Sequence, residues 1–405
     1  MTVNELDINN EDKLENLFST NKENDLLITT GYLSKLLFYS FFWLAILTLF
    51  ICIIDPYGIS PLQITISGIN TEKPGRINID RLIKPYEVWR YQPKTIFLGT
   101  SRIHQSIDPA VLANTEFAPA YNAAVPANKL SENVANLEEY FQLDKNLKNV
   151  FIELFIYNFL IPSPETPKKT LIDFLKTTSS LFLSSDAILA AFQTITFNKF
   201  NGAYESGYIA PGGNWIRPKE FNTNDTFNQS VYISNIINAH RNIPGMYIQP
   251  GSIEALERII VICKKHHAKL YLLITPSYPW DDYRLLSLHY WPLLEEWIRK
   301  ISKYENVYSF SQYNDLLEEQ PGKDMKWWND PLHFSSNMGK LMLESLNKTK
   351  DPLVPQNLIR FVNNHTVESV LKERKKGLAA WSLKNTQFTK DFDHAKKDLR
   401  NDIKD

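Results

Sequence analysis

The chain has 405 residues, 43% hydrophobic and 13% aromatic, which is long enough for one large or two small domains with a substantial core. Lys and Arg number 44 against 45 Asp and Glu, and this balance gives no electrostatic footprint of a nucleic-acid-binding protein. With Cys52 and Cys263 as its two cysteines, the sequence implies no disulfide framework or zinc site, and we expect no metal or other cofactor.

The N-terminal region combines a polar leader with an uninterrupted apolar run. Residues 1–35 are rich in Asn, Asp, Glu and Lys, which predicts a disordered leader. Leu36–Ile54 contains no charged residue, and as a helix it is about 28 Å long, close to the thickness of the hydrocarbon core of a bilayer. It has no polar stripe, and no small-residue cleavage site follows it. We therefore predict a single-pass transmembrane helix that is retained.

The basic residues near this helix predict its orientation. Lys22 and Lys35 precede it, whereas the first basic residue after it is Lys73. This bias favours a cytoplasmic leader and a main domain on the external, periplasmic side. Residues 55–93 contain scattered Pro and Gly and are predicted to be a linker that holds the domain away from the membrane.

From residue 94 onward, short apolar runs alternate with helical patterns. This alternation predicts an α/β domain over residues 94–350 with a five-stranded parallel sheet between two helical layers. The predicted strands are Thr95–Leu98, Ala118–Tyr121, Val150–Phe155, Leu270–Thr275 and Val307–Phe310. The predicted helices include Asn128–Phe141, Ser252–His267 and Leu285–Ile301.

Two further segments differ from this pattern. The stretch 160–250 is longer than an ordinary crossover and is predicted to be an insertion that faces the substrate. It contains Gly207–Trp215, a turn with aromatic residues that suits either sugar stacking or an ordinary surface loop. Residues 351–405 form a polar tail with a helical patch near Thr366–Lys376, whose charge run 372–376 we expect to be a solvated helix face.

The first motif with chemical potential follows the first predicted strand. After Pro93 the apolar run 94–98 ends at Gly99-Thr100-Ser101-Arg102, so Ser101 is expected just past the carboxyl end of a strand. Ligands bind at that edge in open parallel sheets, and a small Gly99 would let a substrate approach the backbone. Ser101 is therefore a candidate nucleophile.

The second motif supplies the partners that a serine nucleophile needs. Asp330-Pro331-Leu332-His333 lies in a loop-like stretch near the end of the domain. A serine hydroxyl needs an imidazole to take its proton and a carboxylate to hold that ring in the correct tautomer. The three-residue spacing allows Asp330 to reach one ring nitrogen of His333, which leaves the other nitrogen for Ser101. We predict a triad of Ser101, His333 and Asp330.

These two motifs resemble the SGNH (GDSL-like) hydrolase superfamily over roughly residues 90–350. Its members carry a nucleophilic Ser in a Gly-x-Ser block and an Asp-x-x-His block near the C-terminus. Thr100 stands where the commonest version of the first block has Asp. The resemblance implies a flavodoxin-like sheet order, and it is strongest for the membrane-anchored branch associated with O-acetylation of exported polysaccharides.

The resemblance also implies oxyanion-hole donors, for which the match is weaker. The second block corresponds to Tyr121–Pro126, which lacks the usual Gly, and here Asn122 is the natural side-chain donor. The third block follows the strand that ends near Phe155, where either Asn158 or Tyr157 fits. The backbone N–H of Ser101 is the remaining expected donor, and losing one donor typically costs about 3–4 kcal/mol of transition-state stabilisation.

The residues near the two motifs have less specific interpretations. Arg102 and His104 are close enough in sequence to line the pocket, although we expect both to be solvated loop residues. Asp281 and Asp282 follow the fourth predicted strand, at the edge where ligands bind. Paired acids in loops are usually solvated.

The sequence thus predicts a membrane-anchored serine esterase or O-acyltransferase that acts on acyl, above all acetyl, esters of an exported or cell-surface polysaccharide. Hydrolysis and transfer use the same residues, so both remain open. The expected partners are the membrane, a carbohydrate substrate and a multi-pass membrane acyltransferase, with no nucleic acid. The alternative is a non-catalytic SGNH-fold protein that binds a glycan or such an acyltransferase.

Overall fold

The computed structural model describes two compact units, Met1–Lys73 with Ser179–Asn201 and Pro74–Thr178 with Gly202–Asp405. The described residues are 32–162, 164, 166–167, 169–170, 171–200, 202, 207–218, 226–242, 246–322, 325–347, 355 and 357–402. The predicted leader therefore lies almost entirely outside the described residues.

The larger unit is built on one sheet with the order β2-β1-β3-β6-β7-β8. Its strands are β1 (Thr95–Leu98), β2 (Ala120–Asn122), β3 (Asn149–Leu154), β6 (Lys269–Ile274), β7 (Val307–Ser309) and β8 (Arg360–Val362). The first five are parallel, and β8 is antiparallel to β7 with Val307 opposite Val362. The predicted five-stranded sheet is therefore one strand short, because β8 comes from the segment that we interpreted as a polar tail.

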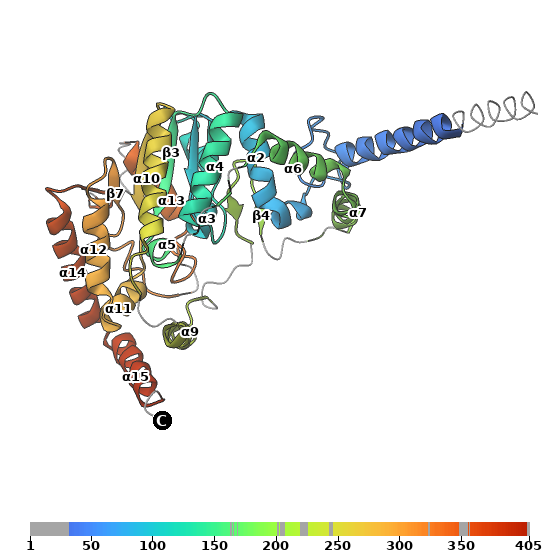
Figure 1. The fold of residues 1–405 in the computed structure, drawn as a ribbon. Helices are drawn as coiled ribbons and strands as arrows, with labels where there is room; N and C mark the ends of the chain where they lie inside the picture. Colours follow the sequence, from blue (N-terminus) through green and yellow to red (C-terminus); the bar gives the residue numbers. More distant parts are fainter. Residues whose placement is uncertain are drawn as a thin grey trace, which may run out of the picture. The chain divides into compact units, whose positions relative to one another are not determined.

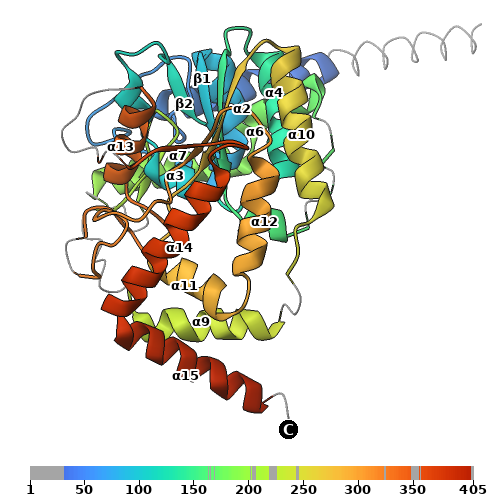
Figure 2. The same ribbon diagram turned by 90° about the vertical axis from the view of Figure 1, so that its left-hand side faces the viewer.

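Helices cover both faces of this sheet (Figure 1). On one face lie α4 (Leu130–Leu143), α10 (Pro250–Lys265) and α12 (Trp291–Ile301), and on the other lie α3 (Ser101–Ser106) and α13 (Ser336–Leu346), as Figure 2 shows. Strands buried from both sides must be apolar throughout, and β1 is buried at every position. The single predicted helix Leu285–Ile301 is in fact two, α11 (Pro279–Ser287) and α12, with His289 between them at a φ of 65°.

Part of the predicted linker belongs to the folded domain. Residues 74–91 form η1 (Pro74–Ile79) and α2 (Asp80–Tyr91), and α2 packs against α4. α2 buries Asp80, Lys84 and Glu87, which the sequence pattern did not distinguish from solvated charges. The linker prediction is therefore wrong for this segment, because its charged residues have buried partners.

The C-terminal segment is also more tightly packed than predicted. It forms α14 (Val367–Lys384) and α15 (Thr386–Asp402), which bury Leu378, Trp381, Phe388 and Phe392. Arg374 lies within the charge run that we expected to face solvent. It is instead buried and forms a bidentate ion pair with Asp282. A buried arginine with a fixed carboxylate partner anchors this helix to α11.

The predicted insertion contains both helices and a small hairpin. After the short helix α5 (Tyr157–Leu160), its elements are α6 (Leu171–Leu183), α7 (Ser185–Lys199), β4 (Tyr208–Ile209), β5 (Trp215–Ile216) and α9 (Gln229–Asn242). The Gly207–Trp215 stretch, predicted as a flexible turn, is an antiparallel hairpin in which Ile209 pairs with Trp215. Parts of this insertion lie outside the described residues.

The smaller unit contains one apolar helix long enough to span a membrane, Tyr32–Ile54. The side chains of residues 32–46 are all exposed, whereas Ile51 and Ile54 near its end are buried. The bent pair α6 and α7 is together apolar enough to count as a second, broken span. The length and composition of the helix Tyr32–Ile54 suit a transmembrane anchor, and the orientation expected from the basic residues stays a prediction.

Candidate active site

The site lies where β1, β3 and β6 end, and Ser101 begins the helix that follows β1. Thr100 caps α3, its side chain accepting a hydrogen bond from the Arg102 N–H at 3.3 Å. Ser101 is the first residue of α3, so its backbone N–H has no partner within the helix. Ser101 is partly exposed and reachable by a substrate. This is the position that the Gly-x-Ser motif predicted.

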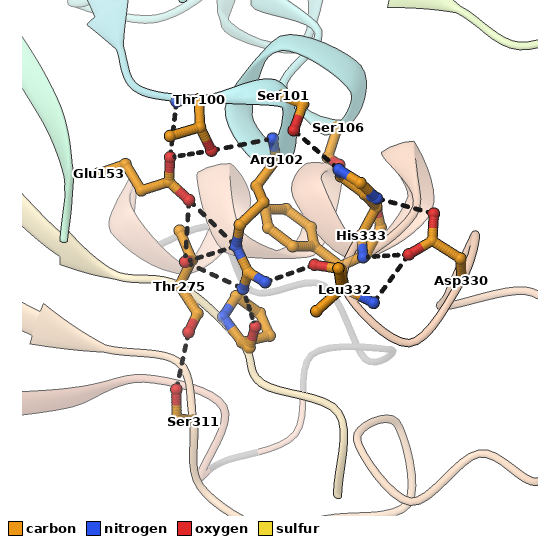
Figure 3. A network of polar contacts seen from close by, with 12 residues as sticks. Thr100, Ser101, Arg102, Ser106, Glu153, Thr275, Ser311, Asp330, Leu332 and His333 are labelled. Atoms are coloured by element: carbon orange, nitrogen blue, oxygen red, sulfur yellow. Dashed lines mark hydrogen bonds and ion pairs between the residues drawn. The ribbon is translucent and has the colours of Figure 1, made fainter. Parts of the chain in front are cut away.

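The predicted triad residues meet through two short hydrogen bonds (Figure 3). Ser101 Oγ lies 2.8 Å from His333 Nε2, and His333 Nδ1 lies 2.7 Å from Asp330 Oδ2. An ionised carboxylate can only accept, so Nδ1 donates to Asp330, and in the neutral ring Nε2 is then free to accept the Ser101 proton. The three side chains are therefore arranged as nucleophile, base and orienting group.

A tight turn holds Asp330 against His333. The His333 N–H donates to the Asp330 carbonyl at 3.2 Å, and Trp328 pairs with Phe334 as an antiparallel bridge. Asp330 Oδ1 accepts the backbone N–H groups of Leu332 and His333 at 2.8 and 2.9 Å. Both carboxylate oxygens are thus fixed, which leaves Oδ2 aimed at the imidazole.

These hydrogen bonds also set the charge of Asp330. Burial opposes ionisation, but the hydrogen bond and charge of His333 and the two backbone N–H groups outweigh it, so the pKa of Asp330 lies below its usual value. Asp330 is therefore ionised at neutral pH. A charged carboxylate stabilises the imidazolium that forms when His333 takes a proton.

Arg102 and Glu153 form a buried ion pair beside the triad, which we call the Arg102–Glu153 brace. Arg102 Nε lies 3.1 Å from Glu153 Oε1, and both side chains are almost completely buried. Glu153 Oε2 accepts the N–H and the hydroxyl of Thr100, both at 2.7 Å. The brace therefore fixes the residue that precedes Ser101.

The same arginine also holds the loop that carries His333. Its guanidinium donates to the carbonyl oxygens of Leu332 and Pro276 and stacks on the Phe155 ring at 4.2 Å. Thr275 Oγ1 accepts from Arg102 at 3.1 Å (Figure 3). One buried cation thus connects the ends of β1, β3 and β6 to the triad loop. The expectation that Arg102 is solvated is wrong.

Gly99 has a different role from the one predicted. A Cβ at this position would lie 2.7 Å from Ile103 Cγ1 and 2.8 Å from Glu153 Cβ. The space beside Gly99 is therefore filled by protein and is not a path for the substrate. Glycine is needed here because the side chain of Glu153 packs directly over the backbone.

We expect Gly99→Ala to lower the free energy of unfolding by about 1–3 kcal/mol, since the added methyl group overpacks the brace. Urea denaturation of the full chain in detergent micelles would measure this loss. Gly322→Ala is the matched control, because its Cβ would meet nothing closer than 3.9 Å. Equal stability of both variants would contradict the packing role of Gly99.

Asn122 is not available as an oxyanion donor, which corrects the prediction. Its side-chain amide donates to the carbonyl oxygens of Ile103 and Ile107 at 2.9 and 2.8 Å. Its Oδ1 accepts the Ala124 N–H at 3.1 Å, and the residue is completely buried. Both amide protons of Asn122 are therefore used to join β2 to α3, and its side-chain oxygen is hydrogen-bonded as well.

The two candidate donors after β3, Tyr157 and Asn158, differ in their hydrogen bonding. The Tyr157 hydroxyl donates to Asp281 Oδ1 at 3.3 Å, and its ring lies against Arg284. Asn158 Nδ2 is buried without a hydrogen-bond partner among the described residues. A buried N–H group without a partner is unfavourable unless something binds it. Asn158 is therefore the stronger of the two candidates for the second donor.

No family model and no curated protein sequence matches this chain.

Several site residues lie outside the two motifs. Arg217, just after β5, is close enough to Asp330 for their charges to interact, although burial lowers the pKa of Arg217. Thr226 Oγ1 donates to the Asn329 carbonyl at 2.7 Å. The insertion thus reaches the triad loop, and a long connection between the third and fourth predicted strands was the sequence signal for it.

A second buried polar cluster positions α2 and the hairpin. His104 Nε2 lies 3.0 Å from Asp80, and Lys84 lies 3.3 Å from the same carboxylate. Lys84 donates to the carbonyl oxygens of Asn122 and Gly213. Burial lowers the pKa of His104, which belongs to this cluster and is not a solvated loop residue as predicted.

The two aspartates after β6 are likewise buried and paired. Asp281 Oδ1 lies 2.7 Å from Arg284, and Asp282 binds Arg374. Burial and the charge of Asp282 raise the pKa of Asp281 to about 7. The expectation of solvated loop acids is wrong, because α11 begins at Pro279 and places both carboxylates inside the fold.

Proposed function

We propose that this chain is a membrane-anchored serine esterase or O-acyltransferase that acts on acetyl or related acyl esters of a carbohydrate. The observation that carries the proposal is the hydrogen-bonded series from Ser101 through His333 to Asp330 at a partly exposed sheet edge. The strand order β2-β1-β3-β6-β7 within the six-stranded sheet adds support, because it is compatible with the flavodoxin-like order that the SGNH resemblance implies.

In the proposed reaction, Ser101 Oγ attacks the acyl carbonyl while His333 takes its proton. His333 then gives the proton to the leaving alcohol, and Asp330 keeps the imidazole oriented throughout. The Ser101 N–H and the Asn158 amide are the proposed donors to the developing oxyanion. Water or a sugar hydroxyl, deprotonated by His333, finally takes the acyl group from Ser101 and restores the free serine.

The hairpin β4–β5 supports a carbohydrate as the bulk of the substrate. β5 contacts α3, and both Tyr208 and Trp215 retain exposed ring surface. Apolar rings beside a few polar groups are typical of small-molecule sites. Together with a tethered domain, this favours a glycan presented near the membrane surface.

A fluorophosphonate probe would test the proposed nucleophile. We expect the full chain in detergent micelles to be labelled at Ser101, identified by peptide mass spectrometry, because the probe reacts with serines that have an adjacent base. Labelling should disappear in Ser101→Ala and fall strongly in His333→Ala, whereas Ser369→Ala, at an exposed position on α14, should leave it unchanged. Undiminished labelling of Ser101→Ala would exclude the assignment.

One observation favours a second candidate, a non-catalytic glycan-binding protein. The amide of Asn122 is committed to backbone carbonyls, so the oxyanion hole lacks the donor expected from the second block. An unlabelled wild-type chain that still binds an acetylated oligosaccharide would support this candidate. Transfer of acetyl to an added oligosaccharide, measured by mass spectrometry, would separate the transferase from the esterase.

A further inference from the structure

Helix α7 packs against the end of the apolar helix Tyr32–Ile54 within the smaller unit. The ring centroids of Phe50 and Phe192 are 5.6 Å apart. Asn198 on α7 accepts the Glu72 N–H at 2.9 Å and donates to the Glu72 carbonyl at 3.0 Å. These contacts hold α7 firmly beside the last turns of the apolar helix.

The end of the apolar helix is capped by protein groups. Lys73 Nζ donates to the Ile54 carbonyl at 3.0 Å, and Asn70 Nδ2 donates to the Ile53 carbonyl at 2.7 Å. The last carbonyl groups of a helix have no partner within it, and lipid cannot supply one. This capping is what a helix end near the boundary of the hydrocarbon core requires.

The length of the uncharged run places the end of the apolar helix, near Ile54, at that boundary. A span needs about 20 residues to cross the hydrocarbon core. Counted from Leu36, the first residue after Lys35, this length ends at Asp55, so Phe50 lies about one and a half helical turns inside the boundary. The point where α7 meets the apolar helix is therefore within about 8 Å of the membrane surface.

α7 has the surface expected of a helix that lies in this interface. Its inner face is buried through Ala187, Ala190, Ala191, Thr194 and Asn198. On its outer face Leu189, Phe192 and Phe200 are 58%, 57% and 73% exposed. In Figure 1, α7 is seen nearly end-on while the apolar helix runs across the page, so the two axes cross steeply. A helix that crosses a span steeply runs along the membrane plane and not through the bilayer.

The polar residues of α7 argue against a second span. Asp186, Gln193 and Lys199 are exposed on the same side as the apolar residues. Charged groups at the centre of a bilayer are costly, whereas an interfacial helix keeps them at the level of the headgroups. α7 therefore suits the surface of a bilayer better than its interior.

We propose that α7 lies in the membrane interface with Leu189, Phe192 and Phe200 among the lipid headgroups and upper acyl chains, as a second membrane contact beside the transmembrane helix. The outer face has one acidic and one basic residue, Asp186 and Lys199, so the partner is the apolar boundary of the bilayer and not an anionic headgroup. This inference does not depend on the proposed catalysis.

Depth-dependent quenching tests the proposal on the full chain in phosphatidylcholine nanodiscs. In a Cys52→Ala/Cys263→Ala background, Leu189→Cys is labelled with a polarity-sensitive fluorophore. We expect strong quenching by a lipid with a nitroxide near the headgroup, weaker quenching by one deep in the acyl chain, and little quenching by aqueous iodide. High salt should not change this pattern.

Val261→Cys is the matched control, because Val261 is 64% exposed on α10 in the larger unit. Its label should be quenched by iodide several-fold more than the label at residue 189. Strong iodide quenching at residue 189 would overturn the proposal. Protection from all quenchers would overturn it as well, since protein would then cover this face, and dominant quenching from the deep position would show a second span instead.

Discussion

In the Asp330→Asn variant, we expect kcat for hydrolysis of an aromatic acetyl ester to fall about 10⁴-fold. The carboxamide can keep its oxygen on the N–H groups of Leu332 and His333, which then turns its NH₂ group toward His333 Nδ1. That ring nitrogen must accept, so the proton moves to Nε2. His333 then presents a donor to Ser101 and cannot act as the base.

Two comparisons make this prediction specific. The melting temperature of Asp330→Asn should stay close to the wild-type value, because the backbone hydrogen bonds to residue 330 persist. Asp108→Asn is the matched control, since Asp108 caps η2 (Pro109–Leu112) and asparagine caps equally well. If the Asp330→Asn variant keeps kcat within tenfold of the wild type, the triad does not carry the reaction.

The strands and the triad could be predicted because both rest on short-range patterns. β1 was predicted with its observed bounds, since the short, largely apolar run between Pro93 and Gly99 leaves little choice. The Asp-x-x-His spacing encodes a turn whose geometry is local. Bringing Ser101 to His333 then requires only that both follow carboxyl ends of a parallel sheet.

The buried charges could not be assigned from such patterns, because their partners are distant in sequence. Arg102 meets Glu153 and Arg374 meets Asp282, and in each pair at least one residue lies in a segment that we interpreted as solvated. A signal was nevertheless present. Glu153 is the only charged residue in the run Val150–Phe155, and a charge inside a buried strand requires a partner.

The oxyanion donors show a second reason why part of the site could not be predicted from the sequence. Asn122 has the residue type and the position that the resemblance implies, yet its amide joins β2 to α3. Hydrogen-bond donors are shared among competing acceptors, and residue type alone does not say which acceptor wins. Packing around α3 decides this outcome, and packing involves side chains from several elements at once.

Loss of the Arg102–Glu153 brace is the second change with a large expected effect, in this case on stability. We expect Arg102→Met to lower the free energy of unfolding by about 3–5 kcal/mol, because Glu153 would remain buried without a cation. The carbonyl oxygens of Leu332 and Pro276 would also lose their donor. Urea denaturation of the full chain in detergent micelles measures this loss. Arg81→Met is the control, since the exposed pair of Arg81 with Glu132 contributes only about 0–1 kcal/mol.

A double variant separates the effect of the unpaired charge on stability from the effect of the lost contacts on activity. In the double variant Arg102→Met/Glu153→Leu no buried charge is left unpaired, so we expect much of the lost stability to return. Activity should not return with it, because neither side chain can then fix Thr100 or the Leu332 carbonyl beside the triad. Recovery of both stability and kcat would mean that the brace only holds the fold together, whereas recovery of stability alone would identify Arg102 as a positioning residue.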